Sequence, residues 1–261
     1  MKLATYNIWN SSRGFPMREA HMIEQLQKID ADICFLQEVS SDALAQKIKE
    51  SLGYPYGCFE SHIGRVIEVE PWKGTEGLAI LSRYPIDSVE MMEYAQIVTL
   101  SMNHKQITCI HVHLPWDSVI VQEQTIIKLI RKVESIPSDY QLIVGDFNCG
   151  ESSSVHHFLK GYRSLNHVEV NRYWTDLAEV AQEFLDRKKR PTLDLSHNPR
   201  WKHNVVTDIS ARVDCIFLKD SFPNEYLRLA DFQMFGEEIY ESTQLCASDH
   251  YGIWVELEFP T

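Results

Sequence analysis

Short apolar runs that end abruptly in polar residues recur along the whole chain. They cover residues 3–6, 33–36, 78–81, 107–112, 142–145, 213–218 and 251–259. Runs of this length that are bounded by Gly, Pro and polar residues are typical of strands buried on both faces. The pattern therefore predicts a sheet-rich core.

Apolar residues at helical spacing separate several of these runs. The expected helices cover residues 16–29, 41–52, 118–136, 153–159 and 175–185. Pro16 stands near the start of the first helix, Gly53 is placed to end the second, and Pro137 follows the third. Strands mixed with helices predict an α/β layered architecture.

Two segments, 53–74 and 186–210, have no clean period and are predicted to be loops, where substrate contacts often lie. The chain contains neither an internal repeat nor a Gly/Ser linker. We therefore expect residues 1–261 to form a single domain.

Composition and charge narrow the class of protein. Of the 261 residues 44% are hydrophobic and 24% charged, which excludes a disordered or low-complexity chain. The net charge of −12 disfavours nucleic acid as a partner, although a bound divalent cation can reverse the field at a phosphate site. Six cysteines without CxxC spacing indicate reduced, mostly buried thiols.

The chain carries no apolar stretch long enough to span a membrane, and its first residues, MKLATYNIWN, turn polar at once. We therefore expect a cytoplasmic protein, and the sequence points to no protein partner.

Polar residues stand at the ends of most of the predicted strands. They are Asn7, Glu38, His113, Asp146, Asn148, Asp249 and His250. If the strands share one sheet edge, these side chains converge on a single cleft. Carboxylate and amide oxygens suit Mg²⁺, Mn²⁺ or Ca²⁺, and a hard cation beside histidines suggests hydrolysis of a phosphate ester. Each residue alone is also an ordinary turn former or helix cap.

Seven motifs carry a family resemblance: YN, FLQE, EGLAILSR, HVHL, GDFN, RVDCIF and SDHYG. In this order they resemble the endonuclease/exonuclease/phosphatase (DNase I-like) superfamily and span Asn7 to His250. The resemblance implies a four-layered α/β sandwich, with two central mixed β-sheets packed face to face and helices outside. It also implies a metal-dependent phosphohydrolase, and it indicates the superfamily rather than a subfamily.

The resemblance assigns roles residue by residue. Glu38 matches a metal ligand, with Asn7 and Asp249 as further residues at the metal. Asp146 and Asn148 match the motif that positions the attacking water and holds a phosphoryl oxygen. His250 resembles the catalytic histidine, and Asp214 resembles the carboxylate that pairs with it.

His113 matches a second histidine of DNase I-like members, and Glu76 stands where that branch has an acid. A Glu76–His113 pair is therefore expected. His111 is the alternative at this position, but it fits the HxL register less well.

The residues around the motifs give only limited information about the substrate. Trp116 and Arg212 are candidate substrate contacts, and Trp9 and Tyr251 also stand beside motif residues. A basic concentration, 187–203, is either a solvated face or a rim that steers anions. The leading hypothesis is a phosphodiesterase or phosphomonoesterase. The alternatives are a DNA or RNA nuclease of the same superfamily, a sphingomyelinase-like lipid phosphodiesterase and a catalytically silent binding module.

Overall fold

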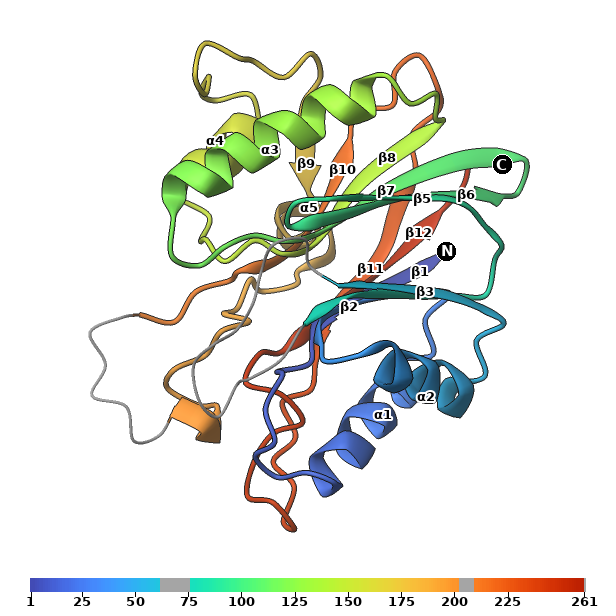
Figure 1. Ribbon diagram of the computed structural model, residues 1–261. Coiled ribbons are helices and arrows are strands. Elements are labelled where there is room, and N and C mark those ends of the chain that lie inside the picture. The colour runs from blue at the N-terminus through green and yellow to red at the C-terminus, as the bar shows by residue number, and fades with distance from the viewer. Residues whose placement is uncertain (62–75, 202–208, 261) are drawn as a thin grey trace.

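Two six-stranded sheets packed face to face form the centre of the computed structural model, which describes residues 1–61, 76–201 and 209–260 (Figure 1). The first sheet has the order β11-β12-β1-β2-β4-β3. Its strands are β1 (Lys2–Asn7), β2 (Ile33–Val39), β3 (Tyr56–Ser61), β4 (Gly77–Ser82), β11 (Arg228–Phe235) and β12 (Gly252–Glu258).

The second sheet has the order β5-β6-β7-β8-β10-β9. Its strands are β5 (Ile86–Met92), β6 (Ala95–Met102), β7 (Lys105–His113), β8 (Tyr140–Asp146), β9 (Trp174–Asp176) and β10 (Asp214–Lys219). In each sheet one central pair is parallel, β1 with β2 and β7 with β8, whereas the other pairs are antiparallel. Both sheets are therefore mixed, as expected.

Helices cover the outer face of each sheet (Figure 1). α1 (Met17–Ile29) and α2 (Asp42–Leu52) lie on the first sheet, and α3 (Val119–Glu134) and α4 (Ser154–Leu159) lie on the second. α5 (Leu177–Leu185) packs into the core between the sheets, and a single 3₁₀ turn, η1, covers Pro199–Trp201. The predicted four-layered α/β sandwich is thus confirmed.

Three apolar clusters explain why the sequences of the central strands are continuous apolar runs. Leu3 and Ile33 point into the core between the sheets, whereas their neighbours Ala4 and Cys34 point toward α1 and α2. A third cluster packs the second sheet against α3 and α4. Successive side chains alternate between faces, so a strand buried on both sides must be apolar at every position.

Local signals set the helix ends. Ser41 and Ser118 accept hydrogen bonds from backbone N–H groups of the first turns of α2 and α3. Gly53 ends α2 in the left-handed conformation, with φ at 70°. The predicted helices were therefore placed to within a few residues, although residues 174–176 form β9 before α5 begins.

One predicted loop is partly wrong. Residues 56–61, within the segment 53–74, form the edge strand β3, which pairs with β4 although its sequence mixes apolar and polar residues and none of its residues is fully buried. The rest of that segment from residue 62 lies outside the described residues. The loop 186–210 is confirmed for 186–201, apart from the turn η1, and residues 202–208 are not described.

Each of the six cysteines is a free thiol; Cys34, Cys109, Cys215 and Cys246 are buried, and Cys58 and Cys149 are partly buried. Among the described helices, none has the length and apolar character that crossing a membrane requires.

Candidate active site

The predicted site residues meet at one end of the two sheets because of strand direction. Asn7 ends β1, His113 ends β7 and Asp146 ends β8, so the parallel pairs deliver their last residues to the same end. β10 and β12 run the opposite way and therefore contribute their beginnings, Asp214 and the neighbouring His250. Residues from both sheets thus reach one cleft of about 770 Å³.

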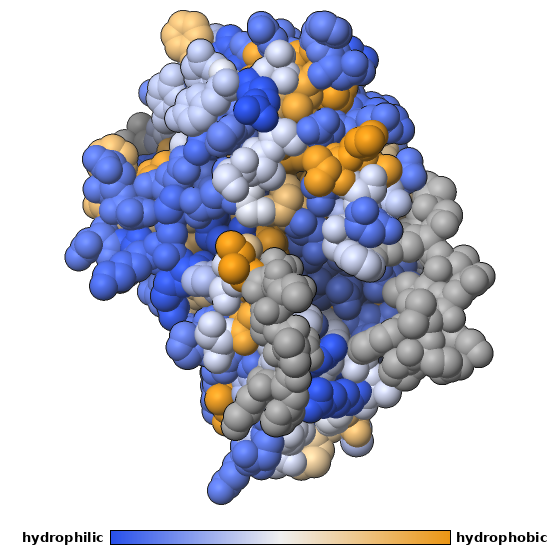
Figure 2. Space-filling view, turned by 90° about the vertical axis from the view of Figure 1, so that its left-hand side faces the viewer, coloured by the Kyte–Doolittle hydropathy of each residue, from blue (hydrophilic) through white to orange (hydrophobic). Residues whose placement is uncertain are grey.

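We call this space the catalytic cleft. It is lined by Glu38, Trp116, Asn148, Cys149, Gly150, Glu151, Ser152, Leu193, Trp201, Ile209, Ser210, Ala211, Arg212, Val213, Asp249 and His250. Figure 2 faces this end of the molecule, where hydrophilic side chains predominate and smaller apolar patches lie among them.

Asn7 joins the two sheets at the floor of the site. Its Nδ2 donates to Oε1 of Glu38 in its own sheet and to Oδ2 of Asp146 in the other, each at 3.0 Å. Its Oδ1 accepts a hydrogen bond from the backbone N–H of Trp9. Asn7 is fully buried, so these contacts fix the amide and hold the two carboxylates on either side of it.

Glu38 reaches the cleft because β2 is irregular near its end. The pairing of β2 with β4 shifts between Leu36 and Val39, and Glu38 has a φ of 58°. Its Oε2 accepts a hydrogen bond from the backbone N–H of Asn10, and its side chain is 24% exposed. Glu38 therefore offers partly accessible carboxylate oxygens beside the Asn7 amide, a donor set that suits a hard divalent cation.

His250 is held by a buried carboxylate. Its Nδ1 lies 3.0 Å from Oδ2 of Asp214 and 4.0 Å from Oδ2 of Asp146. Burial lowers the pKa of His250, but the charges of Asp214 and Asp146 outweigh burial and raise the pKa well above its ordinary value. The imidazolium form is thus the favoured one, with the proton on Nδ1 directed at Asp214.

Asp146 lies at the centre of the site. It is fully buried, and burial together with the charge of Asp214 raises its pKa to about 7. Its Oδ1 accepts from the backbone N–H of Asn148 at 2.8 Å. Asp146, Asp214 and His250 each place one ligand atom within 4.8 Å of the others, so this trio can also accept a metal ion.

Asn148 and Asp249 complete the cleft. Asn148 adopts a φ of 49°, and its Nδ2 donates to the carbonyl of Leu114. Burial raises the pKa of Asp249 to about 6, with a smaller contribution from the charge of Glu38 and with His250 and Arg200 opposing the shift. Asp249 and Glu38 are therefore close enough to interact electrostatically, as two residues at one cation would be.

The second histidine is placed where the motif predicts it. His113 is buried, with Nε2 at 3.7 Å from Oδ2 of Asp146 and 4.0 Å from Oε1 of Glu38. His111 instead points between the sheets, where its Nε2 lies 2.6 Å from Nε2 of Gln37. Glu76 is buried immediately before β4, and its pairing with His113 stays a prediction.

The candidate substrate contacts differ in their surroundings. Trp116 is 72% exposed at the cleft, so its ring is open to a ligand. Arg212 is buried, and its guanidinium donates to Asp176, to Glu151 and to the sulfur of Cys215. These contacts give Arg212 a structural role, and since it also lines the cleft, its contact with a substrate stays a prediction.

Three basic residues at the start of the segment 187–203 are ion-paired. Arg187 pairs with Asp231, Lys189 with Glu151 and Arg190 with Glu237. Lys202 and His203 lie outside the described residues. The solvated, ion-paired face is therefore the better description of Arg187, Lys189 and Arg190.

A buried arginine near the site was not predicted. Arg18 is 1% exposed, and its guanidinium donates to five backbone carbonyls, those of Ile8, Trp9, Ser11, Arg13 and Ala247. It thereby ties the segment after β1 to the segment that carries Asp249 and His250. Its place one turn before Met22, on the buried face of α1, is the sequence signal that could have found it.

The fold is that of a known protein family. The model of the Endonuclease/Exonuclease/phosphatase family matches residues 4–250, so the chain belongs to that family. No curated protein sequence is significantly similar to it.

Solved structures share the fold. TDP2 from D. rerio, solved with a single-strand DNA product, superposes with a TM-score of 0.74 at 16% identity over 99% of both chains. TDP2 from C. elegans gives 0.73 at 17% identity over 98% of this chain and 74% of that one. An endonuclease/exonuclease/phosphatase from Bacteroides vulgatus gives 0.70 at 14% identity over 99% and 98%.

Proposed function

We propose that the protein is a divalent-metal-dependent phosphohydrolase that cleaves a phosphodiester or phosphomonoester by attack of water, and that residues 1–261 form one catalytic domain. The single observation that carries the proposal is the convergence of two sheets on Asp146. The Asn7 amide holds Glu38 on one side of it, and the His250–Asp214 pair lies on the other.

The acidic side of the cleft fits a cation. Glu38, Asn7 and Asp249 would hold Mg²⁺, with Mn²⁺ or Ca²⁺ as alternatives, because their donors are hard oxygens and Glu38 is partly exposed. A bound ion would neutralise charge on the phosphoryl oxygens. We place the ion at Glu38 and not within the Asp146–Asp214–His250 trio, because there the Nδ1 proton of His250 occupies the space between the imidazole and Asp214.

Asp146 and Asn148 are assigned to the water and the phosphoryl group. Asn148 lines the cleft beside His250, and its backbone N–H fixes one oxygen of Asp146, leaving the other directed at Asn7. Water attacks phosphorus while the bond to the leaving oxygen breaks, and a carboxylate oxygen here can accept the proton of that water.

His250 is assigned to charge stabilisation and proton donation. Asp214 fixes the ring through Nδ1, so Nε2–H is the group that can donate to a phosphoryl oxygen or to the leaving oxygen. His113, with Glu76 as the proposed partner, would give a second imidazole on the far side of Asp146.

A nuclease is the second candidate, because the D. rerio TDP2 structure was solved with a single-strand DNA product. The net charge of −12 and the ion-paired state of Arg187, Lys189 and Arg190 count against a long polyanion. A catalytically silent binding module is disfavoured, because Glu38, Asp146, Asp214 and His250 are all present and lie around one site.

A substrate panel tests the proposal. Phosphomonoesters, oligonucleotides and lipid phosphodiesters are incubated with Mg²⁺ or Mn²⁺, with and without EDTA. At least one class should be hydrolysed in a reaction that EDTA abolishes and His250→Ala reduces by several orders of magnitude. Failure to hydrolyse any class, or hydrolysis that survives both EDTA and His250→Ala, would contradict the proposal.

A further inference from the structure

Arg200 lies at the edge of the catalytic cleft between two tryptophan rings. Its guanidinium carbon is 4.7 Å from the ring centre of Trp201 and 5.4 Å from that of Trp9. Trp201 lines the cleft, and Trp9 follows the strand that ends in Asn7. The arginine therefore stands on the Glu38 and Asp249 side of the cleft.

The segment around Arg200 is firmly attached to the site. The Nε1 of Trp201 donates to the backbone carbonyl of Asp249 at 3.2 Å, and Nδ2 of Asn198 donates to that of Ser248 at 3.0 Å. The backbone N–H of Arg200 is bound to Oδ1 of Asn198. These contacts hold the backbone of residues 198–201 against the segment that carries Asp249 and His250.

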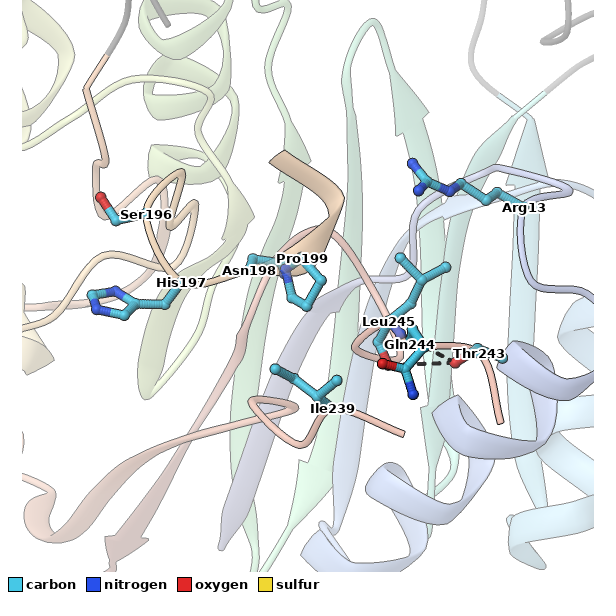
Figure 3. Close-up of a pocket in the computed structure, with 9 residues that line it drawn as sticks. All are labelled: Arg13, Ser196, His197, Asn198, Pro199, Ile239, Thr243, Gln244 and Leu245. Carbon is cyan, nitrogen blue, oxygen red and sulfur yellow. Dashed lines mark hydrogen bonds between the residues drawn. The ribbon is translucent and has the colours of Figure 1, made fainter. Parts of the chain in front are cut away.

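The same segment also lines a second pocket of about 420 Å³, whose lining residues are drawn in Figure 3. Ser196, His197, Asn198 and Pro199 line that second pocket, whereas Trp201 lines the cleft. In the sequence, Arg200 therefore lies between Pro199, which lines the second pocket, and Trp201, which lines the catalytic cleft.

The guanidinium of Arg200 has aromatic faces beside it but lacks an acceptor among the described residues. Its Nε is buried without a hydrogen-bond partner, and it forms no ion pair with a described carboxylate. Arg187, Arg190 and Arg212 are all paired with acids. A guanidinium that lies over aromatic rings and has no acid partner can bind an anion through its terminal Nη–H groups.

We propose that Arg200 binds a second, non-scissile phosphate of the substrate. The inference rests on the proposed phosphohydrolase function and adds the class of substrate, an ester that carries a further phosphate close to the one that is cleaved. The surrounding acids make this selective, because an anion that approaches the carboxylate-rich cleft gains little unless it reaches the Arg200 cation.

Two synthetic esters measure this preference. The p-nitrophenyl ester of thymidine 5′-phosphate is compared with the same ester carrying a 3′-phosphate, in the presence of Mg²⁺. The wild-type protein should have a roughly ten- to hundredfold higher kcat/KM on the second ester, the range expected for charge-assisted hydrogen bonds. Arg200→Gln should bring the ratio of the two kcat/KM values close to one, and Arg200→Lys should leave an intermediate ratio.

Arg190→Gln is the matched control. It removes the same charge from an exposed arginine that is paired with Glu237, so it should keep the wild-type ratio. Thermal melting of each variant checks that it folds. A wild-type ratio near one, or an Arg200→Gln variant that keeps the wild-type ratio, would overturn the inference.

A binding measurement separates this inference from the proposed function. Calorimetric titration with thymidine 3′,5′-bisphosphate and with thymidine 5′-phosphate needs no turnover. If neither ester is cleaved, the proposed function fails, while a tenfold or greater loss of bisphosphate affinity alone in Arg200→Gln still supports the arginine's role. Equal affinity of wild type and variant for the bisphosphate refutes it. Inositol 1,4-bisphosphate as a third ligand distinguishes a nucleotide source of the second phosphate from a sugar-alcohol source.

Discussion

Nδ1 of His250 lies 3.0 Å from Oδ2 of Asp214, with both side chains buried at the meeting point of the two sheets. Asp214 begins β10 and is paired in register with Asp146, the last residue of β8. The imidazole is therefore held by one carboxylate and lies beside a second. This arrangement determines both its orientation and its charge.

Asp214→Asn should lower kcat by roughly two to four orders of magnitude, because the amide neither fixes the Nδ1 proton nor balances the imidazolium. The charge of Asp214 raises the pKa of His250, so its removal lowers that pKa. If protonated His250 is the active form, the alkaline limb of the pH–kcat profile moves to lower pH. Asp87→Asn, an exposed change on β5, serves as the control. An alkaline limb that does not move removes the pair from the mechanism.

Glu38→Gln should raise the Mg²⁺ concentration needed for half-maximal activity by tenfold or more, because it removes an ionised ligand while preserving side-chain shape. Titration of activity against Mg²⁺, and calorimetry with Mn²⁺, measure the shift. Glu60→Gln, on the exposed edge strand β3 of the same sheet, should leave both titrations unchanged. Superimposable curves for wild type and Glu38→Gln would place the ion elsewhere.

Glu76→Gln tests the proposed partner of His113. Loss of the carboxylate should lower the pKa of a paired imidazole and therefore shift one limb of the pH–kcat profile to lower pH. The measurement is the full pH profile of kcat and kcat/KM. An unchanged profile with unchanged stability would show that Glu76 does not act through His113.

His156 makes the stability of the folded protein depend on pH in the acidic range. It is buried between the rings of Phe147 and Phe217, and burial, with a smaller effect from Arg212, lowers its pKa from 6.5 to about 3. Its contribution to stability is complete above pH 6.5 and falls as pH decreases, because the unfolded chain binds a proton that the folded chain does not. The loss approaches about 1.4 kcal/mol per pH unit.

His156→Phe should therefore flatten the fall in unfolding free energy between pH 6.5 and 4.5, as measured by urea denaturation. The pKa of Asp146 is raised to about 7, so this group changes stability with pH in the opposite direction. Because Asp146 is present in both proteins, its effect cancels when the two slopes are compared. His104→Asn, at an exposed position, should keep the wild-type slope. Parallel curves for wild type and His156→Phe would contradict the assignment.

Gly145→Ala should destabilise the protein by about 2 kcal/mol or more. Gly145 has a φ of 138°, and an added Cβ would lie 2.1 Å from the backbone carbonyl oxygen of Val112 on the paired strand. The next residue is Asp146, so activity should fall as well. At Gly150 the nearest atom to an added Cβ is 3.9 Å away, and Gly150→Ala should change the unfolding free energy by less than about 0.5 kcal/mol.

The sequence predicted seven of the strands, most of which are buried on both faces, where burial favours apolar residues. It did not predict β3, β5 or β11, which carry exposed polar side chains such as Glu60, Glu90 and Gln233. It also did not predict the short strand β9 or the strand β6, which is almost fully buried although Gln96, Thr99 and Ser101 interrupt its apolar run. These strands exist through ladder hydrogen bonds to a neighbour, which local composition does not encode.

The site was predictable to the extent that strand ends determine it. Asn7, His113 and Asp146 were placed by the apolar runs before them, and strand direction brought them together. Arg18 does not follow a strand, and its only sequence signal is its place one turn before Met22 on the buried face of α1. The sequence placed Arg200 only within the basic segment 187–203, and its position beside two tryptophan rings depends on the fold. Arg212 shows the converse, because its motif position suggested a phosphate while the fold supplies Asp176 as its partner.

Arg18 has a consequence for biosynthesis. Its guanidinium joins carbonyls near residue 10 to the carbonyl of Ala247, and β1 needs β12 as a neighbour. A nascent chain that has not yet reached β12 therefore has Asn7 and Glu38 but neither His250 nor the bonds that position it. We expect hydrolytic competence to arise only after the segment from Ala247 to β12 has been synthesised, so that shorter ribosome-bound fragments are inert toward phosphate esters.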